Sequence, residues 1–248
     1  MKSIREIYKI GKGPSSSHTM GPERAAQLFR KNYPEADAFR VVLYGSLSKT
    51  GIGHGTDRVI REVLSPLPTE IVFSKEELFG AHPNTMDLIA LTDGQQTGFL
   101  RIESIGGGDI RFPGQSLADS PEVYPEHSFA EIADFCKWRY IDKLSDYVEL
   151  NEGEEIWPFL MEVWKVMKNA IERGLSTTGT LPGGLRVERK AKDLYEKVPH
   201  DGIPALKEFQ LISAFAYAVA EENADNGLIV TAPTCGACGV LPAVLRYA

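Results

Sequence analysis

The chain has 248 residues, 43% of them hydrophobic and 25% charged, which is the balance of an ordinary globular protein of one or two domains. Its 27 Lys and Arg stand against 34 Asp and Glu, giving a net charge of -7. An acidic chain without a run of basic residues argues against nucleic-acid binding and against attachment to an anionic membrane. No stretch reaches the ~18 apolar residues of a membrane span, and the first residues do not resemble a secretion signal, so a cytoplasmic protein is expected.

The first half of the sequence predicts a mixed α+β fold. Pro22 suits the first turn of a helix, and Asp93-Gly94 is a strong signal for a hairpin turn. Thr56 or Asp57 is expected to cap a short second helix. These elements predict helices on one side of a small, largely antiparallel sheet. The predicted segments are helices at Glu23–Asn32 and after Thr56, and strands at Phe39–Tyr44, Thr69–Phe73, Thr85–Thr92, Gln95–Ser104 and Ile110–Phe112.

The second half of the sequence predicts helices only. Ser128 and Glu131 have the spacing of a capping box, and apolar residues recur at helical spacing after residue 156. Gly174 is expected to end that helix. We therefore predict two domains, an α+β domain over residues 1–150 and an all-α domain over residues 151–248. The predicted helices are Ser128–Trp138, Asp142–Glu149, Ile156–Gly174, Arg186–Glu196 and Ala205–Ala224.

Three polar loops of the first half carry histidines. Gly11–Pro22 holds three serines, His18 and Thr19 before a helix start, where backbone N–H groups and the helix dipole favour an anion. The alternative is a solvated Ser-rich turn. Thr50–Asp57 places His54 between glycines, but its spacing fails the dinucleotide fingerprint, so either an exposed reactive histidine or a flexible connection is predicted. Ala81–Thr85 is the third such loop.

Two segments of the second half also invite a chemical interpretation. Cys235 and Cys238 form a C-x-x-C pair, which is compatible with half a zinc site, a redox dithiol, part of an iron–sulfur site, or two small buried side chains. Cys136 is expected to be core. The glycine-rich turn in Gly179–Arg189 either approaches a ligand through its backbone or connects two helices.

Taken together, these segments resemble the bacterial iron–sulfur-dependent L-serine dehydratases. The resemblance rests on motifs that occur in the family's order along the whole chain. They are Pro14-Ser15-Ser16-Ser17-His18-Thr19, Gly53-His54-Gly55-Thr56-Asp57, His82-Pro83-Asn84, Ile105-Gly106-Gly107-Gly108, Leu181-Pro182-Gly183-Gly184-Leu185, Thr231-Ala232-Pro233-Thr234, Gly236-Ala237-Cys238-Gly239 and Leu241-Pro242-Ala243-Val244-Leu245.

The resemblance implies a lyase of amino-acid catabolism and gluconeogenesis that converts L-serine to pyruvate and ammonia, with a 4Fe-4S cluster as Lewis acid. It implies an N-terminal domain like an allosteric substrate-binding domain, the start of an all-α catalytic domain, and a homo-oligomer, with a dimer expected. The implied proton-transfer residues are His18 and His54, the substrate-binding residues Ser15, Ser16, Ser17, Thr19, His82 and Asn84, and the cluster ligands Cys238 and, less typically, Cys235.

The resemblance also leaves alternatives open. Family members usually continue beyond the point that corresponds to Ala248, and their remaining cluster cysteines lie there. The chain is therefore expected to be a fragment, a truncated product or one piece of a split enzyme. The competing hypothesis is a non-catalytic module that binds serine or a related small acid. A zinc or dithiol protein, resting on Cys235 and Cys238 alone, is a third.

Overall fold

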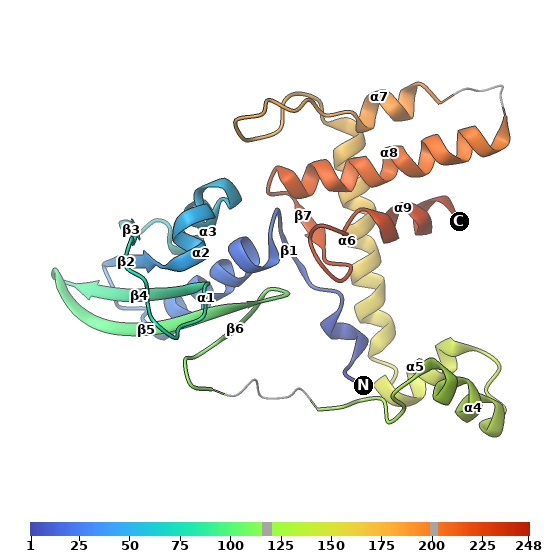
Figure 1. Ribbon diagram of the computed structural model, residues 1–248, viewed down its shortest axis with the longest axis horizontal. Coiled ribbons are helices and arrows are strands. Elements are labelled where there is room, and N and C mark those ends of the chain that lie inside the picture. The colour runs from blue at the N-terminus through green and yellow to red at the C-terminus, as the bar shows by residue number, and fades with distance from the viewer. Residues whose placement is uncertain (116–120, 199–202) are drawn as a thin grey trace.

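A computed structural model describes residues 1–115, 121–198 and 203–248. The sheet with its helices forms one lobe and the long helices form another, with strands β1 and β7 between them (Figure 1). The mixed α+β class predicted from the sequence is confirmed. No helix in the described residues is both long enough and apolar enough to cross a membrane. The helices and strands before residue 115 are β1 (Ile10–Lys12), α1 (Gly21–Asn32), β2 (Ala38–Leu43), α2 (Gly45–Thr50), α3 (Thr56–Leu64), β3 (Thr69–Phe73), β4 (Thr85–Thr92), β5 (Gln95–Gly106) and β6 (Asp109–Arg111).

The five-stranded sheet has the order β3-β2-β4-β5-β6. Only β2 and β3 run parallel, and the remaining neighbours are antiparallel, as predicted. Asp93 and Gly94 have φ of 52° and 75°, which confirms the tight turn between β4 and β5. One sheet face packs on α1 and α3 because alternate residues of the strands are apolar. Their shared core includes Phe29, Phe39, Val41, Leu43, Ile60, Leu64, Met86, Leu88 and Ile102.

The second lobe is built on two long helices that pack against each other. Gly174 lies inside α6, where an added Cβ would stand 2.2 Å from the carbonyl oxygen of Ala218. The prediction that Gly174 ends the helix is therefore wrong, because this glycine lets two backbones approach. The elements after residue 120 are α4 (Phe129–Arg139), α5 (Leu144–Glu152), α6 (Ile156–Ser176), α7 (Ala191–Glu196), α8 (Pro204–Ala224), β7 (Leu228–Val230) and α9 (Val240–Tyr247).

Other local predictions have mixed outcomes. Ser128 accepts a hydrogen bond from the Glu131 N–H at the start of α4, as the capping box predicted. The helix predicted at Arg186–Glu196 begins only at Ala191, because the segment before it forms a bridge between Thr180 and Glu188. Helix α3 has no side-chain cap. The predicted caps fail because Gly55 occupies the N-cap and the Thr56 hydroxyl bonds elsewhere.

A short antiparallel pair, β1 with β7, joins the two ends of the sequence. Ile10 pairs with Val230 and Lys12 with Leu228. The Lys9 N–H donates to Oγ1 of Thr231 at 2.9 Å, across a sequence separation of 222 residues. The N-terminal segment therefore belongs to the contact between the lobes. Helix α5 runs through residue 150, and the domain division predicted at that point stays a prediction.

Candidate functional site

His18 lies in a single wide turn of π-helix, Ser16–Met20, immediately before α1. Its Nδ1 is 2.9 Å from Oγ of Ser17, and its Nε2 is 2.9 Å from Oγ of Ser46, at the start of α2. Serine hydroxyls both donate and accept, so either tautomer of His18 satisfies both contacts. Turns of this kind are rare and concentrate at functional sites. The sequence folds this way because Gly21 and Pro22 start the following helix at once.

His54 lies beside His18, with ring centroids 4.7 Å apart. Its Nδ1 is 2.9 Å from the carbonyl oxygen of Thr50. A carbonyl only accepts, so Nδ1 carries the hydrogen and, in neutral imidazole, Nε2 holds the lone pair. Gly55 follows in the left-handed conformation, with φ of 65°, which turns the chain directly into α3. The structure thus brings the two predicted histidines together, with one ring nitrogen of His54 left to accept a proton.

Two buried threonines fix the backbone of both histidines. Thr19 donates its hydroxyl to the carbonyl of His54 at 2.9 Å, and Thr56 donates its hydroxyl to the carbonyl of His18 at 2.5 Å. Both threonines are fully buried. Each loop therefore holds the other, because a threonine hydroxyl of one loop donates to the backbone carbonyl of the histidine in the other loop. This reciprocal arrangement makes the two loops one unit.

The serines of the first loop differ in their roles. Ser15 accepts the His18 N–H at 3.1 Å, and its Oγ is 3.4 Å from that of Ser17. Ser16 enters through its carbonyl, which accepts the N–H of Gly21. All three are partly exposed, so hydroxyls and a histidine are presented together at one surface. Their predicted role in holding a carboxylate stays a prediction.

The His82-Pro83-Asn84 loop lies next to the histidine loops. The Ser46 N–H donates to the carbonyl of Pro83 at 2.7 Å. Asn84 donates from Nδ2 to the carbonyl of Ser104 at 3.3 Å, and the Ser104 hydroxyl donates to the carbonyl of Ser17 at 2.7 Å. Asn84 Oδ1 is buried without a hydrogen-bond partner. Asn84 therefore reaches the histidine loop only indirectly, through Ser104.

His82 forms hydrogen bonds with Asn84 and Glu103 and not with the histidine pair. Its Nδ1 accepts the Asn84 N–H at 3.2 Å, and its own N–H lies 3.4 Å from a carboxylate oxygen of Glu103. These bonds stabilise the turn before β4. The structure does not join the His82 ring to His18 or His54 by a hydrogen bond, and its predicted substrate contact stays a prediction.

Three residues of this network were missed at the sequence level. Ser46 bonds His18, Thr56 was taken only as a helix cap, and Ser104 was taken only as a strand residue. For Ser46 one signal existed: it follows Gly45, whose φ of 51° turns the chain from β2 into α2. The other two carry no local signal because their partners lie more than 35 residues away in sequence.

The surroundings of His18 keep it neutral. Burial lowers the pKa of His18 below its usual value, and the neighbouring His54 lowers it further, while a hydrogen bond with Ser46 acts in the opposite direction. A neutral imidazole at physiological pH is able to accept a proton as well as to hold hydroxyls in place. His18 therefore suits proton transfer near neutral pH.

The cysteine pair lies in a very different place. Cys235 and Cys238 are 3% and 1% exposed and belong to the apolar cluster of α6, α8 and α9. Burial raises the pKa of the Cys235 thiol to about 11 and of the Cys238 thiol to about 12. Met20, two residues after His18, packs into the same cluster. The histidine loop and the cysteine turn thus pack against the same apolar core. The raised pKa values mean that the cysteines are protonated at neutral pH.

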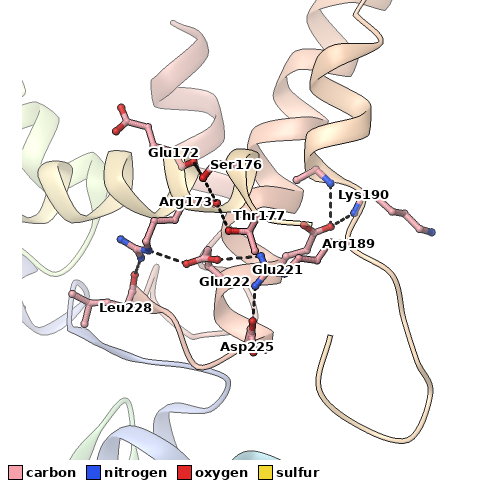
Figure 2. A network of polar contacts seen from close by, with 11 residues as sticks. Glu172, Arg173, Ser176, Thr177, Arg189, Lys190, Glu221, Glu222, Asp225 and Leu228 are labelled. Carbon is pink, nitrogen blue, oxygen red and sulfur yellow. Dashed lines mark hydrogen bonds and ion pairs between the residues drawn. The ribbon is translucent and has the colours of Figure 1, made fainter. Parts of the chain in front are cut away.

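The glycine-rich turn of residues 179–189 is held at its base by an ionic network (Figure 2). Arg189 donates to Glu222 at 3.1 Å and to Asp225 at 2.7 Å, and Arg173 donates to the other oxygen of Glu222 at 2.9 Å. Glu221 accepts the N–H groups of Lys190 and Ala191. The tip, with Leu185 89% exposed, extends from this base. The network fixes where the turn leaves the helices.

A cavity of about 560 Å³ lies on the far side of the histidine loop. Lys9, Lys12, Glu23, Arg24 and Met20 are among its lining residues, and neither histidine is. Its cations are paired with Asp109 and Glu62. Burial raises the pKa of Glu23. Because neither histidine lines this cavity, we place the candidate site at the histidine pair.

Comparison with known proteins identifies the family of the chain. Residues 38–248 match the family model described as the serine dehydratase alpha chain, and residues 3–67 match the one described as the serine dehydratase beta chain. The chain belongs to the serine dehydratase family. Both histidine loops fall within the beta-chain match, and the cysteine turn falls within the alpha-chain match.

Named relatives of the serine dehydratase family match the chain from end to end. It is 35% identical to L-serine dehydratase 2 of Escherichia coli K12, with 100% of this chain and 66% of that protein covered. It is 31% identical to the L-serine dehydratase of Streptomyces coelicolor (99% and 65% covered), and 30% identical to that of Helicobacter pylori (99% and 65% covered). The chain thus spans about two thirds of the length of these relatives.

Proposed function

We propose that this chain takes part in the dehydration of L-serine to pyruvate and ammonia. The observation that carries the proposal is the histidine pair, in which His54 Nε2 is available as a base and His18 is held among hydroxyls. The names of its relatives supply the substrate. The reaction class is a lyase, as the sequence resemblance implies.

The residues of this chain suit the two halves of the reaction. The hydroxyls of Ser15 and Ser17, oriented by His18, offer hydrogen bonds to the substrate carboxylate. His54 Nε2 accepts the α-proton of serine and then donates it to the departing β-hydroxyl, which leaves as water. The resulting aminoacrylate tautomerises to an imine, and water hydrolyses it to pyruvate and ammonia. Atoms balance without an oxidant or reductant.

The cysteines of this chain do not by themselves fit an iron–sulfur cluster. Such a cluster with one open iron needs three thiolates. Cys235 and Cys238 lie in one apolar cluster, whereas Cys136 lies in another, with Tyr124 and Tyr147. The described residues contain no group of three or more His, Cys, Asp or Glu side chains arranged to hold a metal ion. The two paired thiols are therefore at most part of a ligand set, and no step above runs through a cluster.

The test is pyruvate formation from L-serine by the chain as its own gene expresses it, purified without oxygen and supplied with iron and sulfide. We expect turnover that falls by roughly 10²–10⁴-fold in His54→Ala and His18→Ala. The melting temperature of both variants should stay within a few degrees of wild type. His127→Ala is the matched control, because His127 is exposed and its contact runs through its backbone N–H.

The outcomes separate the hypotheses. Turnover that requires pyridoxal phosphate, or wild-type turnover in both histidine variants, contradicts the proposed role. Binding of L-serine without turnover supports the alternative, a non-catalytic serine-binding module, which the hydroxyl-rich loop also favours. The homodimer and the cytoplasmic location implied by the family resemblance belong to the proposal too, and sedimentation and cell fractionation test them.

A further inference from the structure

The face of the five-stranded sheet that α1 and α3 do not cover carries two ion pairs whose carboxylates are buried. Arg101 lies directly across from Asp87, and Arg111 directly across from Glu103. Arg101 donates to both oxygens of Asp87, at 2.6 and 2.7 Å, and Arg111 donates to Glu103 at 2.5 Å. Tyr44 adds a hydrogen bond to Asp87 at 2.9 Å. The four charges form a ladder across β4, β5 and β6.

These pairs differ from an ordinary pair on the same face. Arg40 and Glu70, on β2 and β3, have side chains 49% and 58% exposed, as expected of a solvated sheet face. The side chains of Asp87 and Glu103 are each 7% exposed. The two carboxylates are buried charges, and replacing a buried ion pair by apolar side chains of the same size is often no less stable. Stability alone therefore does not explain why the sheet carries this ladder.

A cavity of about 490 Å³ lies over this ladder. Arg101, Glu103 and Arg111 line its floor, and residues 79–81 and 113–115 line its walls. Arg101 uses Nε and Nη2 for Asp87, and Arg111 uses Nε for Glu103, so neither pair occupies the Nη1 atoms. The arginine side chains are 37% and 32% exposed, unlike the carboxylates behind them. The acids thus hold the guanidinium groups in place while these groups remain open to the cavity.

We propose that this cavity is a binding site for a small carboxylate anion, separate from the histidine site. A guanidinium fork matches the geometry of a carboxylate. Inorganic phosphate shares that chemistry, but a dianion would face the charge of Glu103, which lines the cavity, so a single negative charge fits better. Gly80 and Gly114 lie in the walls of the cavity, with φ of 76° and 78°. A Cβ added at either position would meet nothing within 4 Å, so these walls are open.

The test is titration of the ¹⁵N-labelled chain with acetate, propionate and, separately, inorganic phosphate at constant ionic strength. We expect saturable shifts for acetate and propionate at the amides of Gly80, Ala81 and Gly114. The double variant Glu103→Gln/Arg111→Gln removes one pair without leaving a lone charge, and should weaken binding at least tenfold. Ala81→Phe fills the cavity without touching a charge and should do the same.

Several results would overturn the proposal. They are shifts that never saturate, equal affinity in the wild type and both variants, and tighter binding of phosphate than of propionate. His54→Ala separates this site from the proposed function, because its carboxylate affinity here should equal that of wild type whether or not serine is turned over.

Discussion

The two polar networks of the molecule are made of different groups. Around the histidines, hydroxyls bond to backbone carbonyls and to the ring of His18, whose pKa is lowered by burial. At the base of the glycine-rich turn, guanidinium and carboxylate groups pair around the buried side chains of Arg189 and Glu222. The first network contains imidazoles and hydroxyls, and the second consists of ion pairs. The difference indicates which region does chemistry and which region holds a shape.

The largest effect on stability is expected from breaking the ionic network. The side chain of Arg189 is 3% exposed, and burial alone would lower its pKa, but its bonds to Asp225 and Glu222 more than reverse this. Arg189→Leu leaves Glu222 with Arg173 only. We expect a loss of about 3 kcal/mol in the free energy of unfolding, at the lower end for a broken buried pair. Urea denaturation measures it. Lys197→Ala, which breaks an exposed pair with Asp193, should be near neutral, and equal losses would refute the distinction.

The cysteine turn should resist thiol reagents while the chain is folded. With pKa values raised to about 11 and 12, the thiolate fractions of Cys235 and Cys238 at pH 8 are small. Reaction with a chromogenic disulfide reagent should be on the order of 100-fold slower than in the unfolded chain. Replacing Cys136 by Ala confines the signal to this pair. Fast labelling of the native chain would show that the turn is open or the thiols activated.

The neutral network should be less costly to disrupt, yet measurable. Thr56→Val removes the hydroxyl that the His18 carbonyl accepts and leaves that carbonyl unpaired. We expect a loss of roughly 1–3 kcal/mol in unfolding free energy. Thr178→Val, at an exposed threonine whose hydroxyl bonds no other described residue, is the matched control. A loss no greater than that of the control would mean that the two histidine loops do not depend on each other.

The smallest expected effect is a change in pH dependence. Because the pKa of His18 is lowered in the folded chain, the unfolded chain binds more protons as the pH falls through about 6.5, and stability falls with it. Below the folded pKa this loss levels off. His18→Gln should flatten that slope of melting temperature against pH, whereas His127→Gln should leave it unchanged. An unaltered slope in His18→Gln would mean that the imidazole is as easily protonated folded as unfolded.

Sequence patterns predicted the parts of this molecule that local chemistry decides. The Asp93-Gly94 turn and the Ser128 cap both follow from residues within four positions of one another. Gly174 was misread because its reason is a second helix, more than 40 residues away, whose backbone it touches.

The candidate site divides in the same way. Histidines stand out in a sequence by their chemistry, so His18 and His54 were singled out, and the structure places their rings side by side. Ser46 is an unremarkable residue until the fold places its hydroxyl on His18 Nε2. No sequence pattern singles out the acids Asp87 and Glu103, and only their burial distinguishes them from Glu70. Contacts between residues that are far apart in sequence determine the roles of these residues, and the local residue pattern does not predict such contacts.

The pairing of β1 with β7 determines the order in which parts of the chain can fold during synthesis. Ribosomes add about 5–20 residues per second, so the 222 positions between Lys9 and Thr231 take roughly 11–44 s to emerge. The β4–β5 hairpin can close well before then, since its strands are adjacent in the chain. The strand that leads into the His18 turn must wait with its edge open until residue 230 has left the tunnel. The nascent chain thus completes its five-stranded sheet before β1 can pair with β7.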